Sequence, residues 1–331
     1  MHLRTIMKQF VFFLILFFSI HATGQSIPDT SKWELSFSDE FDSVYSYPYI
    51  IDTVKWYRYF PFSQGGMPPT CNCKTDANTH VVTCDTLGKT YFTQWNDLPG
   101  SNLQVDTSGT GTLKIIARKQ NFTAITSAYL KCGSPECDAN KKCYWNTRTR
   151  DSICTNHDTV LFNYTTAMLY SRQKFKYGYF EMKYKIPETP LPPATNYGFT
   201  IDWWLWHRDG SESNEIDMFE IRAKDNMYTT NVHYKRDVAG TDLAGKTYYH
   251  TTKLDGNWHI SGLEWGPDQI DFSLDGEKIH SYPFNPDSMI PMPMIIDLVP
   301  NALNFCNGVD PLHTVLPFEF DVDYVRVYRS K

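Results

Sequence analysis

Three features are scarce in this 331-residue chain, and each scarcity excludes a class of protein. Charged residues make up only 21% of the chain, the formal net charge is −6, and no basic run is present, so we expect no nucleic-acid partner. After the first 24 residues, no apolar run reaches the roughly 20 residues of a membrane-spanning helix. No helical stripe of apolar residues stands out there either. What is plentiful is aromatic residues, at 15%, which require a large core.

The beginning of the chain has the order of a secretory signal peptide. Arg4 and Lys8 supply the positive start, an apolar run follows over residues 10–20, and small residues at 22–24 provide a cleavage signal. We therefore expect a mature chain from near Gln25, exported to the periplasm or secreted, with no membrane span after removal of the leader. A retained membrane anchor is the alternative, which the short apolar run disfavours.

Eight cysteines fit an oxidising compartment. Seven of them lie between positions 71 and 154, and the eighth is Cys306. An even number of cysteines in an exported chain indicates disulfides, although their pairing stays open. A zinc site is the alternative, but no histidine stands at finger-like spacing from these cysteines. We predict a signal peptide over 1–24 and a single domain over 25–331, with a disulfide-stapled surface insertion at about 65–160.

Alternation of apolar and polar residues dominates the rest of the chain. Every second residue is apolar from Gly178 to Ile186, and the same period continues over residues 318–328. The dipeptide Asp275-Gly276, between two alternating runs, is typical of a tight hairpin turn. Further strands are expected at 112–118, 166–172, 228–235 and 259–265. Many strands separated by turns favour an all-β fold, either an antiparallel sandwich or a barrel.

One expected strand carries three carboxylates. Glu215 and Asp217 share a face by alternation, whereas Glu220 falls on the opposite face of a regular strand. One extra residue at 218–219, a β-bulge, returns Glu220 to the shared face, and bulges recur beside active sites. Three like charges at one spot raise at least one pKa, so that a carboxylic acid stays protonated near neutral pH. An edge strand with solvated acids is the alternative.

This strand and its flanks resemble the family 16 glycoside hydrolases, whose active-site strand reads Glu-x-Asp-x-(x)-Glu. Supporting segments occur in family order at residues 37–41, 177–181, 198–206, 263–268, 274–276 and 322–328. The resemblance covers residues 33–331, with the Cys-rich stretch as the poor match. It implies a β-jelly-roll sandwich of two antiparallel sheets with a concave substrate cleft, which hydrolyses a polysaccharide.

The resemblance also implies a retaining double displacement. Glu215 matches the nucleophile, Glu220 matches the acid/base, and Asp217 matches the residue that hydrogen-bonds the nucleophile. This chemistry needs no metal or other cofactor, and we expect a monomer that cleaves a β-1,3-glucan, a mixed-linkage glucan or a β-galactan. A transglycosylase with the same site is one alternative, and a carbohydrate-binding jelly roll without turnover is another.

The resemblance further implies substrate-binding residues in the cleft, namely Trp204, Trp206, Glu181 and His233, and we add Asp202 from its place on the same strand. By alternation, both tryptophans share a face with Asp202, from which their rings can stack on sugars. The ordinary alternatives are core packing for the tryptophans, an ion pair for Glu181, and hydrogen bonds to neighbouring residues for His233. Asp202 and Asp297 stand where the family usually has Ala and Asn, and this added acid disfavours heavily sulfated chains.

A structural calcium site is the last feature that the resemblance implies. Asp323, with Glu40, matches a site between the N-terminal and C-terminal strands of the family. Calcium takes 6–8 oxygen ligands, so backbone and water oxygens have to complete the shell. A surface aspartate without a metal is the alternative.

Overall fold

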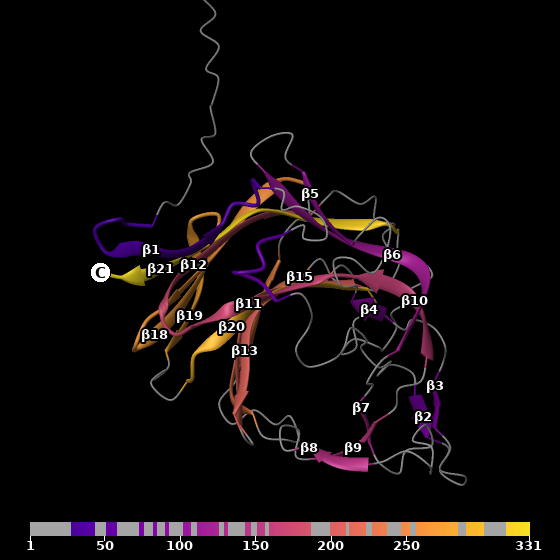
Figure 1. The fold of residues 1–331 in the computed structure, drawn as a ribbon. Coiled ribbons are helices and arrows are strands. Elements are labelled where there is room, and N and C mark those ends of the chain that lie inside the picture. Colours follow the sequence, from indigo (N-terminus) through magenta and orange to yellow (C-terminus); the bar gives the residue numbers. More distant parts are fainter. Residues whose placement is uncertain are drawn as a thin grey trace, which may run out of the picture.

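The computed structural model describes residues 28–43, 51–57, 73–75, 82–84, 90–92, 102–106, 111–125, 129–131, 143–146, 151–155, 159–186, 199–209, 212–222, 227–236, 246–251, 256–283, 289–300 and 316–331. Strands are the regular structure of this part of the chain (Figure 1). The expected leader lies outside these ranges. Within them, no helix has the length and apolar character needed to cross a membrane.

The larger sheet contains ten strands. Its order is β19 (Glu277–Pro283), β18 (Gln269–Leu274), β17 (Trp258–Trp265), β12 (Gly178–Lys185), β21 (Phe318–Ser330), β6 (Thr112–Ile125), β10 (Thr159–Thr166) and β4 (Thr90–Phe92), with β1 (Trp33–Asp39) beside β21 and β5 (Leu103–Asp106) beside β6. All of these pairs are antiparallel except β10 with β4. The N-terminal and C-terminal strands of the described chain therefore lie side by side.

The second sheet contains six antiparallel strands. Its order is β11 (Met168–Phe175), β20 (Met292–Pro300), β13 (Phe199–Asp209), β14 (Glu212–Arg222), β15 (Met227–Arg236) and β16 (Lys246–Thr251). The strand with three acids, β14, lies inside this sheet between β13 and β15. An edge position with solvated acids is thereby excluded.

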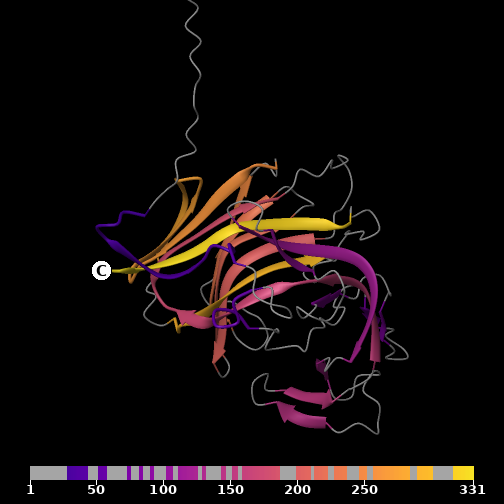
Figure 2. The ribbon, with the colours of Figure 1, turned by 45° about the horizontal axis from the view of Figure 1, so that its top comes forward.

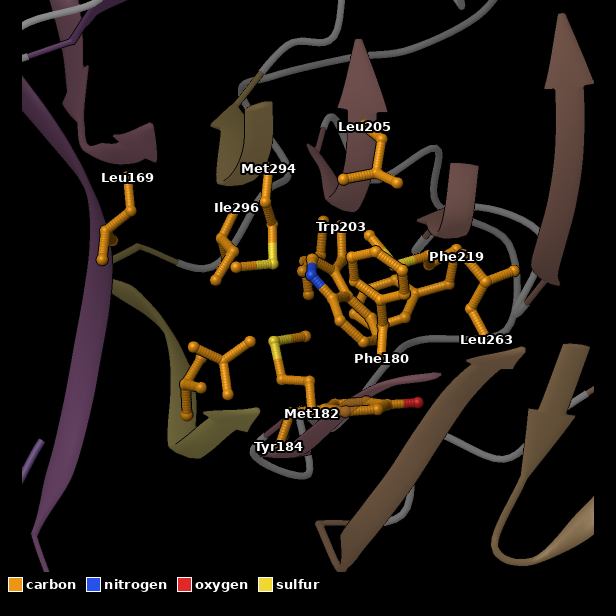
Figure 3. Packing of buried hydrophobic residues seen from close by; sticks show 14 of the residues in the cluster. Leu169, Phe180, Met182, Tyr184, Trp203, Leu205, Phe219, Leu263, Met294 and Ile296 are labelled. Carbon is orange, nitrogen blue, oxygen red and sulfur yellow. The ribbon is translucent and has the colours of Figure 1, made fainter. Parts of the chain in front are cut away.

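Both sheets turn their apolar side chains toward a common core. Trp203 and Phe219 from the six-stranded sheet meet Phe180 and Tyr184 from the ten-stranded sheet, and their side chains are almost fully buried (Figure 3). Phe219 lies 4.8 Å from Tyr184 and 5.9 Å from Trp203 between ring centroids, within the range of favourable aromatic pairs. The predicted sandwich of two antiparallel sheets is confirmed. Alternation fixes which side chains enter its core.

Most of the predicted strands occur at their predicted places. The hairpin turn between β18 and β19 has φ of 52° at Asp275 and 84° at Gly276, the left-handed backbone that this dipeptide tolerates. The run 166–172, however, is not one strand. The ladder of β10 ends at Thr166 and that of β11 begins at Met168, so the chain passes from one sheet to the other at the buried Ala167.

The Cys-rich segment divides into two parts. β5, β6 and β10 belong to the ten-stranded sheet, so the expected insertion at about 65–160 is not wholly peripheral. Two small sheets stand outside it, namely β2 (Cys73–Thr75) with β3 (Val82–Cys84), and β7 (Tyr129–Lys131) with β9 (Asp151–Thr155) and β8 (Cys143–Asn146). Figure 2 shows the β7–β9–β8 sheet apart from the sandwich.

The registers of these small sheets predict two disulfides. Cys73 stands directly opposite Cys84, and Cys143 directly opposite Cys154. Facing residues of an antiparallel pair have Cα atoms about 4.5–5.5 Å apart, which lies inside the range that a disulfide spans. We expect peptide mapping without reduction to recover both pairs. Stoichiometric zinc, or either cysteine of a pair linked elsewhere, would contradict this pairing.

Candidate active site

A β-bulge in β14 brings the three predicted carboxylates to one face. In the register with β13, Trp203 pairs with Phe219 and Trp204 pairs with Asp217, so Met218 is the extra residue. The ladder with β15 is irregular over the same interval, between Asp217 and Glu220. The bulge predicted at 218–219 is confirmed. It resets the alternation by one residue, which returns Glu220 to the face of Asp217.

The opposite face of β14 explains why this strand tolerates its acids. Ile216, Met218, Phe219 and Ile221 are fully buried in the sandwich core. The carboxylates therefore lie on the face of the six-stranded sheet that turns away from that core, where Glu215 and Glu220 are half-buried. Asp217, the middle one, is only 3% exposed.

Polar side chains of β15 stand opposite the three acids. Its register places Thr229 opposite Glu220, Asn231 opposite Asp217, and His233 opposite Glu215. The Thr229 hydroxyl donates to Glu220 Oε2 at 3.3 Å. Thr229 and Asn231 were not among the predicted site residues. Alternation along the strand expected at 228–235 puts them on the same face as His233, and this is the sequence signal that could have found them.

His233 joins the carboxylates in space. Its Nε2 lies 3.5 Å from Asp217 Oδ2 and also contacts the amide of Asn231. Donor atoms of Glu215, Asp217 and His233 all fall within 4.8 Å of one another, so among the described residues this group has the composition of a cation site. The same carboxylate oxygens are those that nucleophilic and acid/base chemistry uses.

The two predicted tryptophans lie beside the acids on β13. Trp204 and Trp206 are half-buried, with ring centroids 6.2 Å apart. Trp206 stands opposite Glu215 in the register, and Trp204 stands opposite Asp217. Core packing is thereby excluded as their role, because the core side of β13 is occupied by Trp203 and its neighbours. The rings instead form an aromatic platform next to the carboxylates.

Two further aspartates extend the acidic face across β13 and β20. Asp202 stands opposite Glu220 on one side and opposite Asp297 on the other. Burial, and then the charges of Asp297 and Glu220, raise the pKa of Asp202 well above its ordinary value. Burial raises the pKa of Asp297 to about 6, against hydrogen bonds from Asp202 and Trp204 that lower it. Close carboxyls in a buried place cannot all ionise.

Glu181 does not join this group. It belongs to β12 in the other sheet, on the face opposite to the core residues Phe180 and Met182. The hydroxyl of Tyr324 donates to Glu181 Oε1 at 2.8 Å, and that of Tyr179 donates to Oε2 at 3.4 Å. The prediction that Glu181 lines the cleft is therefore wrong. Alternation along β12 turns Glu181 to the outer face of its own sheet.

The predicted calcium residues have other partners. Glu40 receives two hydrogen bonds from the guanidinium of Arg326, at 2.9 and 2.7 Å. Asp323 forms an ion pair with Lys183 at 2.6 Å. Each carboxylate is already matched with a cation, so Asp323 and Glu40 do not fit a shared calcium site.

Comparison with known proteins agrees with this geometry. The sequence profile of "Glycosyl hydrolases family 16" matches residues 137–302, which is half of the chain and includes all three carboxylates. The chain belongs to this family. Among curated relatives, a β-glucanase of Acetivibrio thermocellus is 30% identical over 123 residues, which are 36% of this chain and 33% of the relative. The endo-1,3-1,4-β-glycanase ExsH of Rhizobium meliloti is 26% identical over 170 residues, which are 50% and 34%.

Solved structures of the same fold are similar to this chain over most of its length. One, reported with endo-acting O-glycanases that human gut bacteria express to initiate mucin breakdown, has a TM-score of 0.60 at 19% identity and covers 90% of this chain and 91% of its own. This likeness supports the fold alone. The chain spans about a third of the length of the curated relatives it matches.

Proposed function

We propose that this chain is an endo-acting β-glycosidase that hydrolyses a neutral β-glucan by a retaining double displacement. The observation that carries the proposal is the bulge of β14, which puts Glu215, Asp217 and Glu220 on one face beside an aromatic platform. A binding module without turnover needs the aromatic rings but not three carboxylates at such a cost in electrostatic repulsion.

The roles divide along the strand. Glu215 attacks the anomeric carbon, and the bond to the leaving oxygen breaks as Glu220 gives that oxygen its proton. Glu220, now a carboxylate, then takes a proton from water, whose oxygen displaces Glu215 and restores the free enzyme. Asp217 lies between them, and its role is to hydrogen-bond the nucleophile and tune its charge, with His233 Nε2 3.5 Å from Asp217 Oδ2. The proposed chemistry uses no metal.

The substrate class rests on the relatives and on charge. The curated relatives are named as β-glucanases or as a 1,3-1,4-β-glycanase, which favours a β-1,3-glucan or a mixed-linkage glucan. Five carboxyls lie on this face of the six-stranded sheet in the described part of the chain, and those that are ionised repel sulfated or uronic chains. We further propose that the protein acts as an exported monomer.

The test is product analysis on a panel of β-1,3-glucan, mixed-linkage glucan and agar-type galactan. We expect short reducing oligosaccharides from a glucan, and proton NMR of the first products should show the β-anomer before mutarotation. An α-anomer first would mean inversion and overturn the roles of Glu215 and Glu220. Elongation of an added oligosaccharide would indicate transglycosylation. Products from the galactan alone would change the substrate class, and binding without products would leave a lectin-like module.

A further inference from the structure

A row of three acids crosses the middle of the six-stranded sheet. Glu220 on β14, Asp202 on β13 and Asp297 on β20 occupy successive register positions on one face. Like charges on directly opposite residues of neighbouring strands destabilise a sheet. Asp202 stands between the other two and so has an acidic neighbour on both sides.

One hydrogen-bond donor is missing among the groups around these three acids. The Thr200 hydroxyl donates to Asp202 Oδ2, and the Trp204 indole donates to Asp297 Oδ2, each at 3.2 Å. The remaining oxygens, Asp202 Oδ1 and Asp297 Oδ1, are buried and receive no N–H or O–H from the described groups. Asp297 is only 3% exposed, too buried to leave a charged oxygen unpaired. A proton held between the two carboxyls would supply the missing donor.

We propose that Asp202 is a neutral carboxylic acid that donates its proton to Asp297, and that this pair positions Trp204 and keeps one negative charge, instead of two, beside Glu220. Asp202 carries the proton because it has two acidic neighbours. Asp297 carries the charge because the Trp204 indole, which can only donate, already gives its N–H to Asp297 Oδ2. Asp202 and Asp297 are thus positioning residues, and this role rests on the proposed function.

The surroundings of the pair decide how it responds to pH. Besides Glu220, the titratable groups on neighbouring strands are Asp217 on β14 and His233 on β15, while Arg222 occupies the register position opposite Thr200. On the far side of Asp297, β11 presents Met168. One negative charge on the pair favours the protonated form of Glu220, which the first step of hydrolysis requires.

The proton makes a prediction about stability that is independent of catalysis. Both pKa values of the pair are raised above the ordinary 3.8, so from about pH 4 upward the folded state keeps protons that the unfolded state releases. This contribution to stability therefore falls as pH rises. Asp202→Asn keeps a donor toward Asp297 and has no proton to lose. We expect its Tm, relative to wild type, to rise by about 3 °C between pH 4.5 and pH 8.

Asp268→Asn is the matched control, because Asp268 is exposed on the turn before β18, and its Tm difference should stay flat with pH. A flat difference for Asp202→Asn as well would overturn the shared proton. Should that variant fail to fold, infrared spectroscopy of Glu220→Gln decides, since this variant lacks the acid/base proton and a protonated carboxyl band still has to persist at pH 6 in its folded state. Loss of that band by pH 6 would also overturn it.

The role beside Glu220 is tested by the pH profile of kcat/KM. Asp202→Asn leaves one charge on the pair and should keep the alkaline limb in place, whereas the double variant Asp202→Asn/Asp297→Asn removes the charge and should move that limb down by about 1 pH unit. An alkaline limb at the same pH in both variants would refute the electrostatic role of the pair and would leave the shared proton unaffected. A chain without any hydrolytic activity would instead refute the proposed function, and the Tm series would still report on the pair.

Discussion

Replacement of Glu215 by glutamine is expected to lower kcat on the preferred β-glucan by about 10⁴-fold or more. The amide keeps the volume of the side chain but cannot attack the anomeric carbon, so no glycosyl-enzyme forms. The neighbours on the face, Trp206 and His233 at the facing register positions, are unchanged. Oligosaccharide affinity by calorimetry should therefore stay within a few-fold of wild type.

The control for this variant is Glu264→Gln. Glu264 is an exposed glutamate on β17 of the other sheet, so the same chemical change there should leave kcat and affinity unaltered. Glu215→Gln with kcat above a tenth of the wild-type value would rule out its role as nucleophile. A loss of affinity parallel to the loss of kcat would instead make Glu215 a binding residue.

The fold was predictable from sequence because it follows from local rules. Period-two alternation over Gly178–Lys185 and the Asp275-Gly276 turn are properties of neighbouring residues, and the structure contains both. The passage from one sheet to the other at Ala167 was not predictable, because alternation looks the same on either side of a change of sheet. Sheet membership is a long-range property of pairing partners.

The same distinction explains the candidate site. The bulge at Met218 was predictable because three acids on one strand of a sandwich have few other ways to share a face. Glu181 was misplaced because a motif match says nothing about which sheet a strand joins. Asp202 and Asp297, which share the proposed proton, are far apart in the sequence, and only the register of β13 with β20 brings them together.

Replacement of Glu220 by alanine separates the two halves of the proposed reaction. Alanine removes the general acid, so hydrolysis of the polysaccharide should fall by about 10²–10⁴-fold. The highly acidic phenol of an activated aryl glycoside leaves without being protonated. For such a substrate, the rate of the first step should therefore fall far less. The measurement compares the initial burst of released phenol with the steady-state rate of its release. The control is Glu277→Ala, at an exposed glutamate of β19, which should behave as wild type.

The second half of the reaction is where small anions should substitute for Glu220. In the alanine variant the glycosyl-enzyme accumulates, because no base activates water, and Thr229 faces an empty position where it now donates to Glu220. Azide needs no base. Its terminal nitrogen bonds to the anomeric carbon, the bond to Glu215 breaks, and Glu215 is released as a carboxylate. We expect azide to restore steady turnover and to yield a β-glycosyl azide by NMR; an α-glycosyl azide, or no rescue in a variant that still shows the burst, would remove Glu220 from the acid/base role.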